Sequence, residues 1–262
     1  MSSDKMISKV EDGVGWMIFN NPERHNAISL EMWEAALDIM QGFAADPSVR
    51  VMILTGSGGK AFASGADISK FKDERQEAAA VAHYQTLTQK AYETLQAMPI
   101  PTIAMVRGYC IGGGTAVAVC CDIRICTENA KFGVPAAKLG LGYGLNRAMP
   151  LVDLVGPAFA KEMFFTGRQF DAREAERMGL VNRVVADDQL ESTVEEMART
   201  IAGNAPLTVR CAKLVVGQAL KDASQRDVPA TERAVEACFK SNDYREGQAA
   251  FMEKRKPKFT GT

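Results

Sequence analysis

Histidine is scarce in this chain, which has 262 residues and carries only His25 and His83. The six cysteines form no Cys-x-x-Cys pair and lie mostly within apolar runs. Zinc sites and disulfide frameworks need such groups at regular spacings, so we expect reduced, buried thiols and no metal. The shortage of histidine also argues against a serine nucleophile, because Ser64 has no histidine and aspartate in a triad pattern near it.

The chain also lacks a long apolar run and an excess of charge of either sign. Residues 1–6 contain no apolar signal core, and residues 115–121 fall far short of the roughly 20 that span a bilayer. A formal net charge of −1 and a pI near 6.2 offer no broad attraction for nucleic acid or membranes. We therefore expect a cytoplasmic, globular protein with neither of these partners, in which local groups hold any anionic ligand.

Strand-like and helix-like segments alternate through the first part of the chain. Residues 14–19, 49–55 and 102–106 are β-rich apolar runs, and a helical pattern follows each of them. After Asp187 the pattern is helical throughout, with apolar stripes that require a packing partner. This order predicts an α/β fold of stacked strand-strand-helix turns over residues 1–190 and a helical region over residues 191–262.

Two glycine-rich stretches, residues 64–68 and 108–114, lie where a strand-like run passes into a helical one. The first N–H groups of a helix have no intrahelical partner and point outward at the positive end of the helix dipole. Glycine at such a junction permits unusual φ angles and lets a ligand approach the backbone closely. Together the two stretches predict an oxyanion hole, which is a pair of backbone donors placed for a developing negative charge.

Six stretches of the chain, in their order and spacing, resemble the crotonase (enoyl-CoA hydratase/isomerase) superfamily: residues 20–28, 61–68, 111–114, 165–167, 179–181 and 253–257. The resemblance covers nearly the whole chain. It implies a crotonase-like spiral of ββα turns with an acyl-CoA site in residues 1–190. It also implies a C-terminal helical region in residues 191–262 that forms a homotrimer or a dimer of trimers.

The same resemblance implies roles for individual residues. The backbone N–H groups of Ala66 and Gly113 would bind the thioester oxygen of an acyl-CoA as it becomes an enolate. Coenzyme A enters as part of the thioester, so no separate cofactor is expected. Arg255 and Lys256 are expected to be solvated. The residues implied to contact coenzyme A are Arg24, Ala27, Ser64, Ala66, Asp67, Ile68 and Lys254.

The chain departs from the family's hydratases at their two catalytic glutamates, because Ala116 and Ala136 stand at those positions. A third family position, used for an aspartate by some isomerases and a dehalogenase, falls near Gly144. General acid or base participation contributes about 10² to 10⁴ in rate. We therefore expect slow hydration, and we expect other acids such as Glu74, Glu77 and Asp153 to face water.

Two further functions stay open at this stage. Tyr143 lies where a methylmalonyl-CoA decarboxylase of the family carries a tyrosine that contacts the substrate carboxylate, so the chain could decarboxylate malonyl-type thioesters. That decarboxylase has a histidine at the position of Ala66 and a glutamate at that of Ala116, so the match is partial. The other possibility is a non-catalytic acyl-CoA binding protein that kept the pocket and lost the acids.

The polar residues around these positions also have structural interpretations. Tyr143 could be a core or interface tyrosine whose hydroxyl bonds to the backbone. Asn146 and Arg147 could polarise a substrate, but an asparagine beside a helix start favours a helix N-cap. Asp67 is expected to cap a short helix that follows Ala66.

Overall fold

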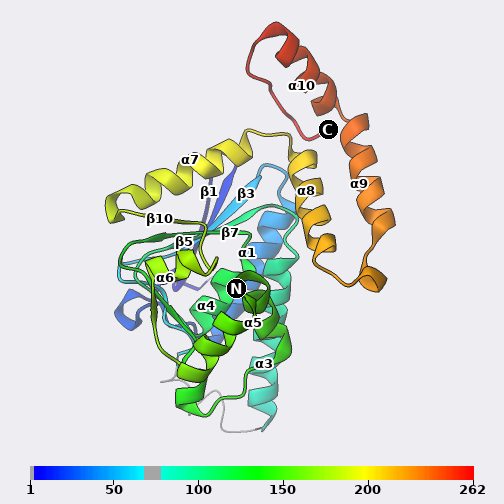
Figure 1. The fold of residues 1–262 in the computed structure, drawn as a ribbon. Helices are drawn as coiled ribbons and strands as arrows, with labels where there is room; N and C mark the ends of the chain where they lie inside the picture. The colour runs from blue at the N-terminus through cyan, green and yellow to red at the C-terminus, as the bar shows by residue number, and fades with distance from the viewer. Residues whose placement is uncertain (1–2, 68–77) are drawn as a thin grey trace.

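Two sheets organise the chain in the computed structural model, which describes residues 3–67 and 78–262 (Figure 1). The larger sheet has the strand order β1-β2-β3-β5-β7-β10, and the smaller one has the order β4-β6-β8-β9. The strands of the larger sheet are Met6–Glu11, Val14–Phe19, Val51–Gly56, Thr102–Val106, Ile123–Thr127 and Arg183–Val185. Those of the smaller sheet are Ala61–Ala63, Tyr109–Ile111, Lys131–Gly133 and Phe170–Asp171.

One unit recurs along the chain: a strand of the larger sheet, a strand of the smaller sheet, then a helix. The three copies are β3-β4-α3, β5-β6-α4 and β7-β8-α5, whose helices span Ala78–Gln96, Gly113–Cys120 and Leu145–Thr166. Equivalent strands of successive units pair in parallel, so the units stack in register. The structure confirms the predicted α/β fold of strand-strand-helix turns.

The N-terminal hairpin was not anticipated from the sequence. β1 pairs antiparallel with β2 through a two-residue turn in which Asp12 and Gly13 both have positive φ, at 50° and 80°. Such turns match the twist of the flanking strands and favour the Asp-Gly pair. The apolar signal of β1 is weak because it is an edge strand in which only Met6 is buried.

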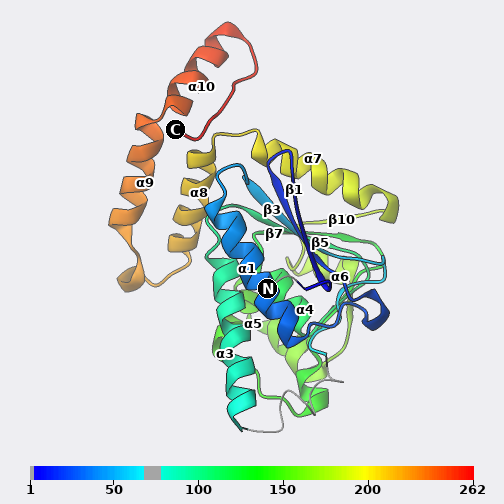
Figure 2. The same cartoon turned by 180° about the vertical axis from the view of Figure 1, so that it is seen from behind.

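Both faces of the larger sheet are covered, which explains why its central strands are apolar at successive positions. Met52 and Leu54 pack in the core that includes α1 (Leu30–Ala45) and α3, two helices that lie side by side in Figure 2. Val51 and Ile53 face the other way and pack with α7 (Leu190–Ala202). Helix α7, which begins at the boundary predicted between residues 190 and 191, therefore packs against the sheet. The division into two domains at that boundary stays a prediction.

Four of the six thiols belong to this packed interior. Cys110, Cys120, Cys121 and Cys126 are buried, whereas Cys211 and Cys238 are partly exposed. Burial raises the pKa of Cys120 and of Cys126 to about 12. The prediction of buried thiols is confirmed for these four positions, and their reduced state stays a prediction.

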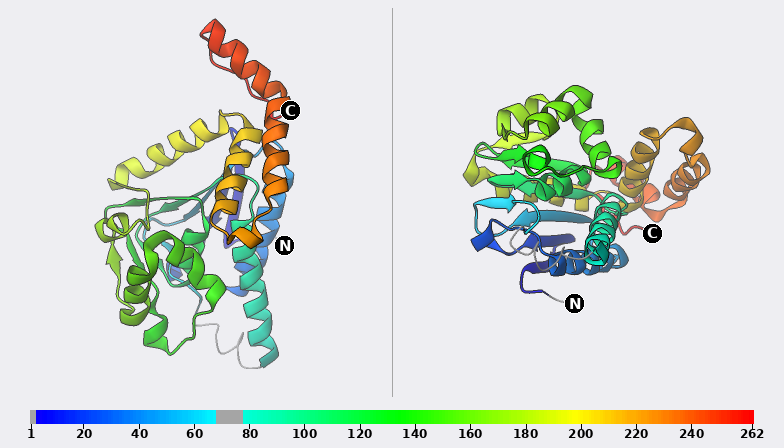
Figure 3. Two further views of the ribbon diagram at one scale, coloured as in Figure 1. Left: turned by 45° about the vertical axis from the view of Figure 1, so that its right-hand side comes forward. Right: turned by 90° about the horizontal axis from the view of Figure 1, so that it is seen from below.

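The C-terminal helices α8 (Pro206–Ala219), α9 (Val228–Lys240) and α10 (Asn242–Glu253) form an arm that extends from the body (Figure 1 and Figure 3). They confirm the predicted helical region. Their apolar side chains stay open to solvent in this single chain, as Phe251 and Met252 show with exposed fractions of 83% and 80%. Large apolar surface of this kind marks an interaction site.

Within the part of the chain that the structure describes, no helix combines the length and the apolar character that crossing a membrane requires.

Candidate active site

The two glycine-rich stretches meet at the end of β4 and the start of α4. A Cβ atom built on Gly114 would lie 2.1 Å from the carbonyl oxygen of Ala63, so only glycine allows the helix to approach the strand this closely. A Cβ built on Gly65 would lie 3.3 Å from the nitrogen of Gly113. Two segments almost fifty residues apart in sequence are therefore in backbone contact.

The N–H of Ala66 points away from the segment around Ile28, with which Ala66 forms an isolated parallel bridge. Ile28 donates its N–H to the carbonyl of Gly65 at 2.8 Å, and Asp67 donates to the carbonyl of Ile28 at 3.1 Å. In such a parallel bridge the residue between the two bonds directs its own N–H to the opposite side. Among the described residues, the Ala66 N–H has no backbone acceptor.

The N–H of Gly113 is exposed for a different reason. Gly113 is the first residue of α4, after Gly112 with a φ of 57° as the N-cap. The first N–H groups of a helix have no intrahelical acceptor, and within the described chain that of Gly113 finds no other backbone acceptor. A Cβ built on Gly113 would lie 3.6 Å from the nitrogen of Ala66, so two unpaired donors lie side by side.

These donors line a cavity of about 230 Å³. The rest of its wall comes from α1, from α3, from the short helix Pro135–Leu139 and from the segment that leads into α5. One face of α3 supplies Tyr84, Thr88 and Tyr92, which follow at helical spacing. The cavity thus combines backbone donors with aromatic, aliphatic and polar side chains.

The family model described as Enoyl-CoA hydratase/isomerase matches residues 9–262. The crotonyl-CoA hydratase of Syntrophomonas wolfei is 35% identical over 259 residues, which cover 99% of each chain. The short-chain-enoyl-CoA hydratase of Clostridium acetobutylicum is 34% identical over 256 residues, covering 98% of this chain and 97% of its own. The chain belongs to the enoyl-CoA hydratase/isomerase family.

Solved structures show the same relationship for the fold. An enoyl-CoA hydratase/carnithine racemase from Magnetospirillum magneticum superposes with a TM-score of 0.94 at 38% identity, over 100% of this chain and 97% of its own. The resemblance to the crotonase superfamily and its spiral fold is confirmed, and the chain is a crotonase-family acyl-CoA enzyme.

In this family member, five of the residues predicted to contact coenzyme A belong to the described part of the first seventy positions: Arg24, Ala27, Ser64, Ala66 and Asp67. Arg24 forms an ion pair with Asp67, with 3.3 Å between Nη1 and Oδ1. Ser64 donates its hydroxyl to the carbonyl of Arg24 at 3.3 Å. Asn21 holds the same loop by donating its side-chain amide to the carbonyl of buried Ala27 at 3.0 Å. Half of the Arg24 side chain stays exposed, at 50%, whereas that of Asp67 is 8% exposed.

One predicted residue lies apart from this group. Lys254 ends α10 with a φ of 55°, and α10 lies on the arm away from the cavity (Figure 1). Ile68 lies outside the described residues, as do the acids Glu74 and Glu77 and the helix that Asp67 was expected to cap. Asp153 is exposed on α5, as expected.

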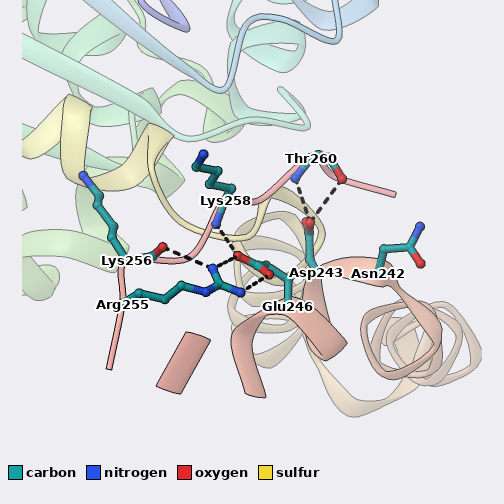
Figure 4. Close-up of a pocket in the computed structure, with 7 residues that line it drawn as sticks. All are labelled: Asn242, Asp243, Glu246, Arg255, Lys256, Lys258 and Thr260. Atoms are coloured by element: carbon teal, nitrogen blue, oxygen red, sulfur yellow. Dashed lines mark hydrogen bonds and ion pairs between the residues drawn. The ribbon is translucent and has the colours of Figure 1, made fainter. Parts of the chain in front are cut away.

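A second hollow, of about 660 Å³, lies between α10 and the C-terminal tail (Figure 4). Glu246 accepts hydrogen bonds from Arg255 at 2.6 Å and from the backbone N–H of Lys258 at 2.8 Å. These contacts with Arg255 lower the pKa of Glu246 to about 2. Asp243 accepts from the N–H of Thr260 at 2.7 Å. Arg255 is exposed, as expected, and also pairs with Glu246 because the tail folds back along the helix.

The positions of the family's acids hold small apolar residues. Ala136 lines the cavity, Ala116 is buried one turn after Gly113, and Gly144 is exposed at the start of α5. Within the described residues, no Asp, Glu or His side chain lines the cavity. The three positions where the family carries acids therefore hold no ionisable side chain in this chain.

Tyr143 lines the cavity and packs against Phe164, with 4.8 Å between the ring centroids. Burial raises its pKa to about 12, so the hydroxyl is protonated at neutral pH. The structure does not support the predicted N-cap role of Asn146. The N-cap of α5 is Gly144 and has no side-chain hydrogen bond, so Asn146 already lies within the helix.

Sequence reasoning missed most of the cavity's side-chain wall. Trp33, Tyr84, Thr88 and Tyr92 were not singled out, and Arg147 was considered only beside the cap interpretation. The helical spacing of residues 84, 88 and 92 was a usable signal, because it places them on one face of α3. Spacing alone does not tell whether such a face meets the core or a ligand.

Proposed function

We propose that the chain binds acyl-CoA thioesters and stabilises their enolates with the N–H groups of Ala66 and Gly113. One observation carries the proposal: two adjacent backbone donors that have no backbone acceptor among the described residues line one cavity. A donor fixed in such a site contributes roughly 2.7–4 kcal/mol to stabilising an oxyanion. The relatives are hydratases of short enoyl-CoA thioesters by name, which supports a thioester substrate here.

Efficient hydration is not part of the proposal. Adding water to an enoyl thioester requires one group to deprotonate water and one to protonate the α-carbon. Ala116 and Ala136 stand where the family's hydratases have those acids, and among the described residues no carboxylate lines the cavity. We expect an intact oxyanion hole with water addition slowed by about 10² or more.

Decarboxylation of a malonyl-type thioester is the second candidate, favoured by the place of Tyr143 in the cavity. The bond between the carboxylate carbon and the α-carbon breaks, and CO2 leaves. The electron pair passes through the α-carbon to the thioester oxygen, where the two N–H groups stabilise the charge. No base is needed to make the enolate, and the α-carbon takes its proton from water afterwards. The protonated hydroxyl of Tyr143 would orient the departing carboxylate.

Assembly enters the proposal through the arm. Lys254 lies on α10, away from the Arg24 loop, so we propose that it reaches the coenzyme A site of a neighbouring copy. The exposed apolar residues of α8 to α10 would be covered in the same trimer. The loop around Arg24, Ala27, Ser64 and Asp67 would hold the coenzyme A of its own chain, together with Ile68.

The experiment is turnover of crotonyl-CoA, a longer 2-enoyl-CoA and methylmalonyl-CoA, followed by mass spectrometry with a coenzyme A binding titration beside it. Loss of CO2 from methylmalonyl-CoA supports the decarboxylase. Rapid water addition would show that an acid outside the described cavity wall reaches the site. Tight binding without any turnover would leave an acyl-CoA binding protein, and no binding of coenzyme A would contradict the whole proposal.

A further inference from the structure

Arg147 is the charged side chain in the described wall of the cavity. It lies in the first turn of α5 and donates from Nη2 to the hydroxyl oxygen of Thr88 at 2.9 Å. Its guanidinium carbon is 5.6 Å from the centroid of the Tyr92 ring, near the outer limit of a cation–π contact. Among the described residues, no Asp or Glu forms an ion pair with it.

Thr88 fixes the position of this cation without neutralising it. The Thr88 hydroxyl, which is buried, donates to the carbonyl of Tyr84 at 2.9 Å and therefore offers a lone pair to Arg147. A guanidinium carries five N–H donors in a rigid plane, and this bond uses one of them. The remaining donors are available to a ligand in the cavity.

Other side chains in the same cavity wall also offer hydrogen-bond donors. Burial raises the pKa of Tyr92 well above its ordinary value and that of Tyr143 to about 12, so both hydroxyls keep their protons. The indole N–H of Trp33 is buried and has no acceptor among the described residues. A partly buried cation with no acidic partner among the described residues favours a ligand that brings negative charge, and the indole N–H of Trp33 favours one that brings an acceptor.

The cation and the backbone donors share one small cavity. A volume of about 230 Å³ lies below the usual range of ligand pockets, which favours a short acyl chain. Ala66, Gly113 and Arg147 all line this space. With the thioester oxygen held by Ala66 and Gly113, an acceptor elsewhere on the same short acyl chain would meet Arg147.

We propose that the preferred substrate is the thioester of a short dicarboxylic acid, whose free carboxylate is bound by the guanidinium of Arg147. The proposal rests on the proposed function, since it names the substrate class of the same cavity. Arg147 then acts as a specificity residue for the acyl group. A planar guanidinium matches a carboxylate with two parallel hydrogen bonds, which lysine does not reproduce.

The test compares glutaryl-CoA with pentanoyl-CoA, two saturated thioesters of equal carbon number that differ in the terminal carboxylate. Dissociation constants are measured by calorimetry for the full chain and for R147Q, R147K and the control R173Q. Arg173 is exposed on α6 (Ala172–Arg177), outside the cavity. We expect the unaltered chain to bind glutaryl-CoA more tightly than pentanoyl-CoA. R147Q should raise the dissociation constant of glutaryl-CoA by about 10- to 100-fold. The same variant should change the dissociation constant of pentanoyl-CoA less than threefold, and R147K should keep part of the preference for glutaryl-CoA.

Equal weakening of both thioesters in R147Q would overturn the proposal, because it would show that Arg147 only clamps α5 to α3. Equal affinity of the unaltered chain for the two thioesters would overturn it as well, while leaving the proposed function intact. Failure of the unaltered chain to bind either thioester or free coenzyme A would instead contradict the proposed function. Free coenzyme A should bind R147Q normally, which controls for loss of the fold.

Discussion

The wall of the cavity has two parts that are built from different parts of the polypeptide. The backbone part consists of the N–H groups of Ala66 and Gly113, held by the contact between β4 and α4. The side-chain part comes from α1, α3 and α5 and includes Tyr92, Tyr143 and Arg147. Every substitution except proline leaves a backbone donor in place, whereas any substitution replaces a side chain. Under the proposed function, the backbone part would hold the thioester oxygen and the side-chain part would determine which thioester is bound and which reaction follows.

Placing acids into the cavity should have the largest effect. Ala116→Glu with Ala136→Glu supplies the two groups that hydration lacks, and burial would raise their pKa values toward a useful range. We expect the hydration rate of crotonyl-CoA to rise by about 10² to 10⁴. Stopped-flow loss of enoyl absorbance measures it. The matched glutamine pair has the same size without the acids, so a similar rise in that variant would refute the assignment of these positions.

Removing a backbone donor is the next largest test. Gly113→Pro deletes the N–H at the first position of α4, where proline is tolerated. We expect a loss of about 10² to 10³ in kcat for the thioester that is turned over. Infrared spectra of a bound thioester with a labelled carbonyl should show the stretch moving back toward its value in water. Gly113→Ala keeps the donor, and its Cβ meets nothing closer than 3.4 Å. In that variant the carbonyl stretch should stay close to its frequency in the unaltered chain.

Tyr143→Phe tests the side-chain part of the cavity wall and leaves the backbone donors in place. A hydrogen bond to a charged group contributes about 1.5–3 kcal/mol, so decarboxylation should slow about 10- to 100-fold. The labelled carbonyl stretch should stay where it is in the unaltered chain, because the donors at Ala66 and Gly113 remain. Full decarboxylase activity in the variant would remove Tyr143 from the mechanism.

The smallest effect concerns pH. The pKa of Tyr143 is raised to about 12 by burial, above its value of roughly 10 in the unfolded chain. The folded state therefore keeps this proton longer, and its stability falls as pH rises from about 10 to about 12, by at most about 1.4 kcal/mol per pH unit. Urea unfolding at pH 9, 10 and 11 should show a shallower decline for Tyr143→Phe. An identical decline in both proteins would mean that the tyrosine titrates normally.

Glycine-rich turns explain why the two backbone donors could be predicted from the sequence. Glycines at the junctions of strands and helices specify where backbone donors emerge, and the spacing of residues 61–68 and 111–114 resembled the family. The strands β2, β3 and β5 were predicted with nearly their observed bounds, since each is a continuous apolar run. Edge strand β1 was missed because one face meets water and its apolar pattern is weak.

The sequence by itself determined the α/β repeat, the family and the two donor turns, because each depends on residues that are neighbours in the chain. Only the tertiary structure decided that Gly65 and Gly113 are in contact, that one face of α3 lines a cavity and that Arg147 lies in its wall. It also replaced the predicted cap at Asn146 by Gly144 and paired Arg24 with Asp67. The physical reason is that a helical stripe shows which residues share a face but not what that face meets, since this depends on the packing of elements distant in sequence.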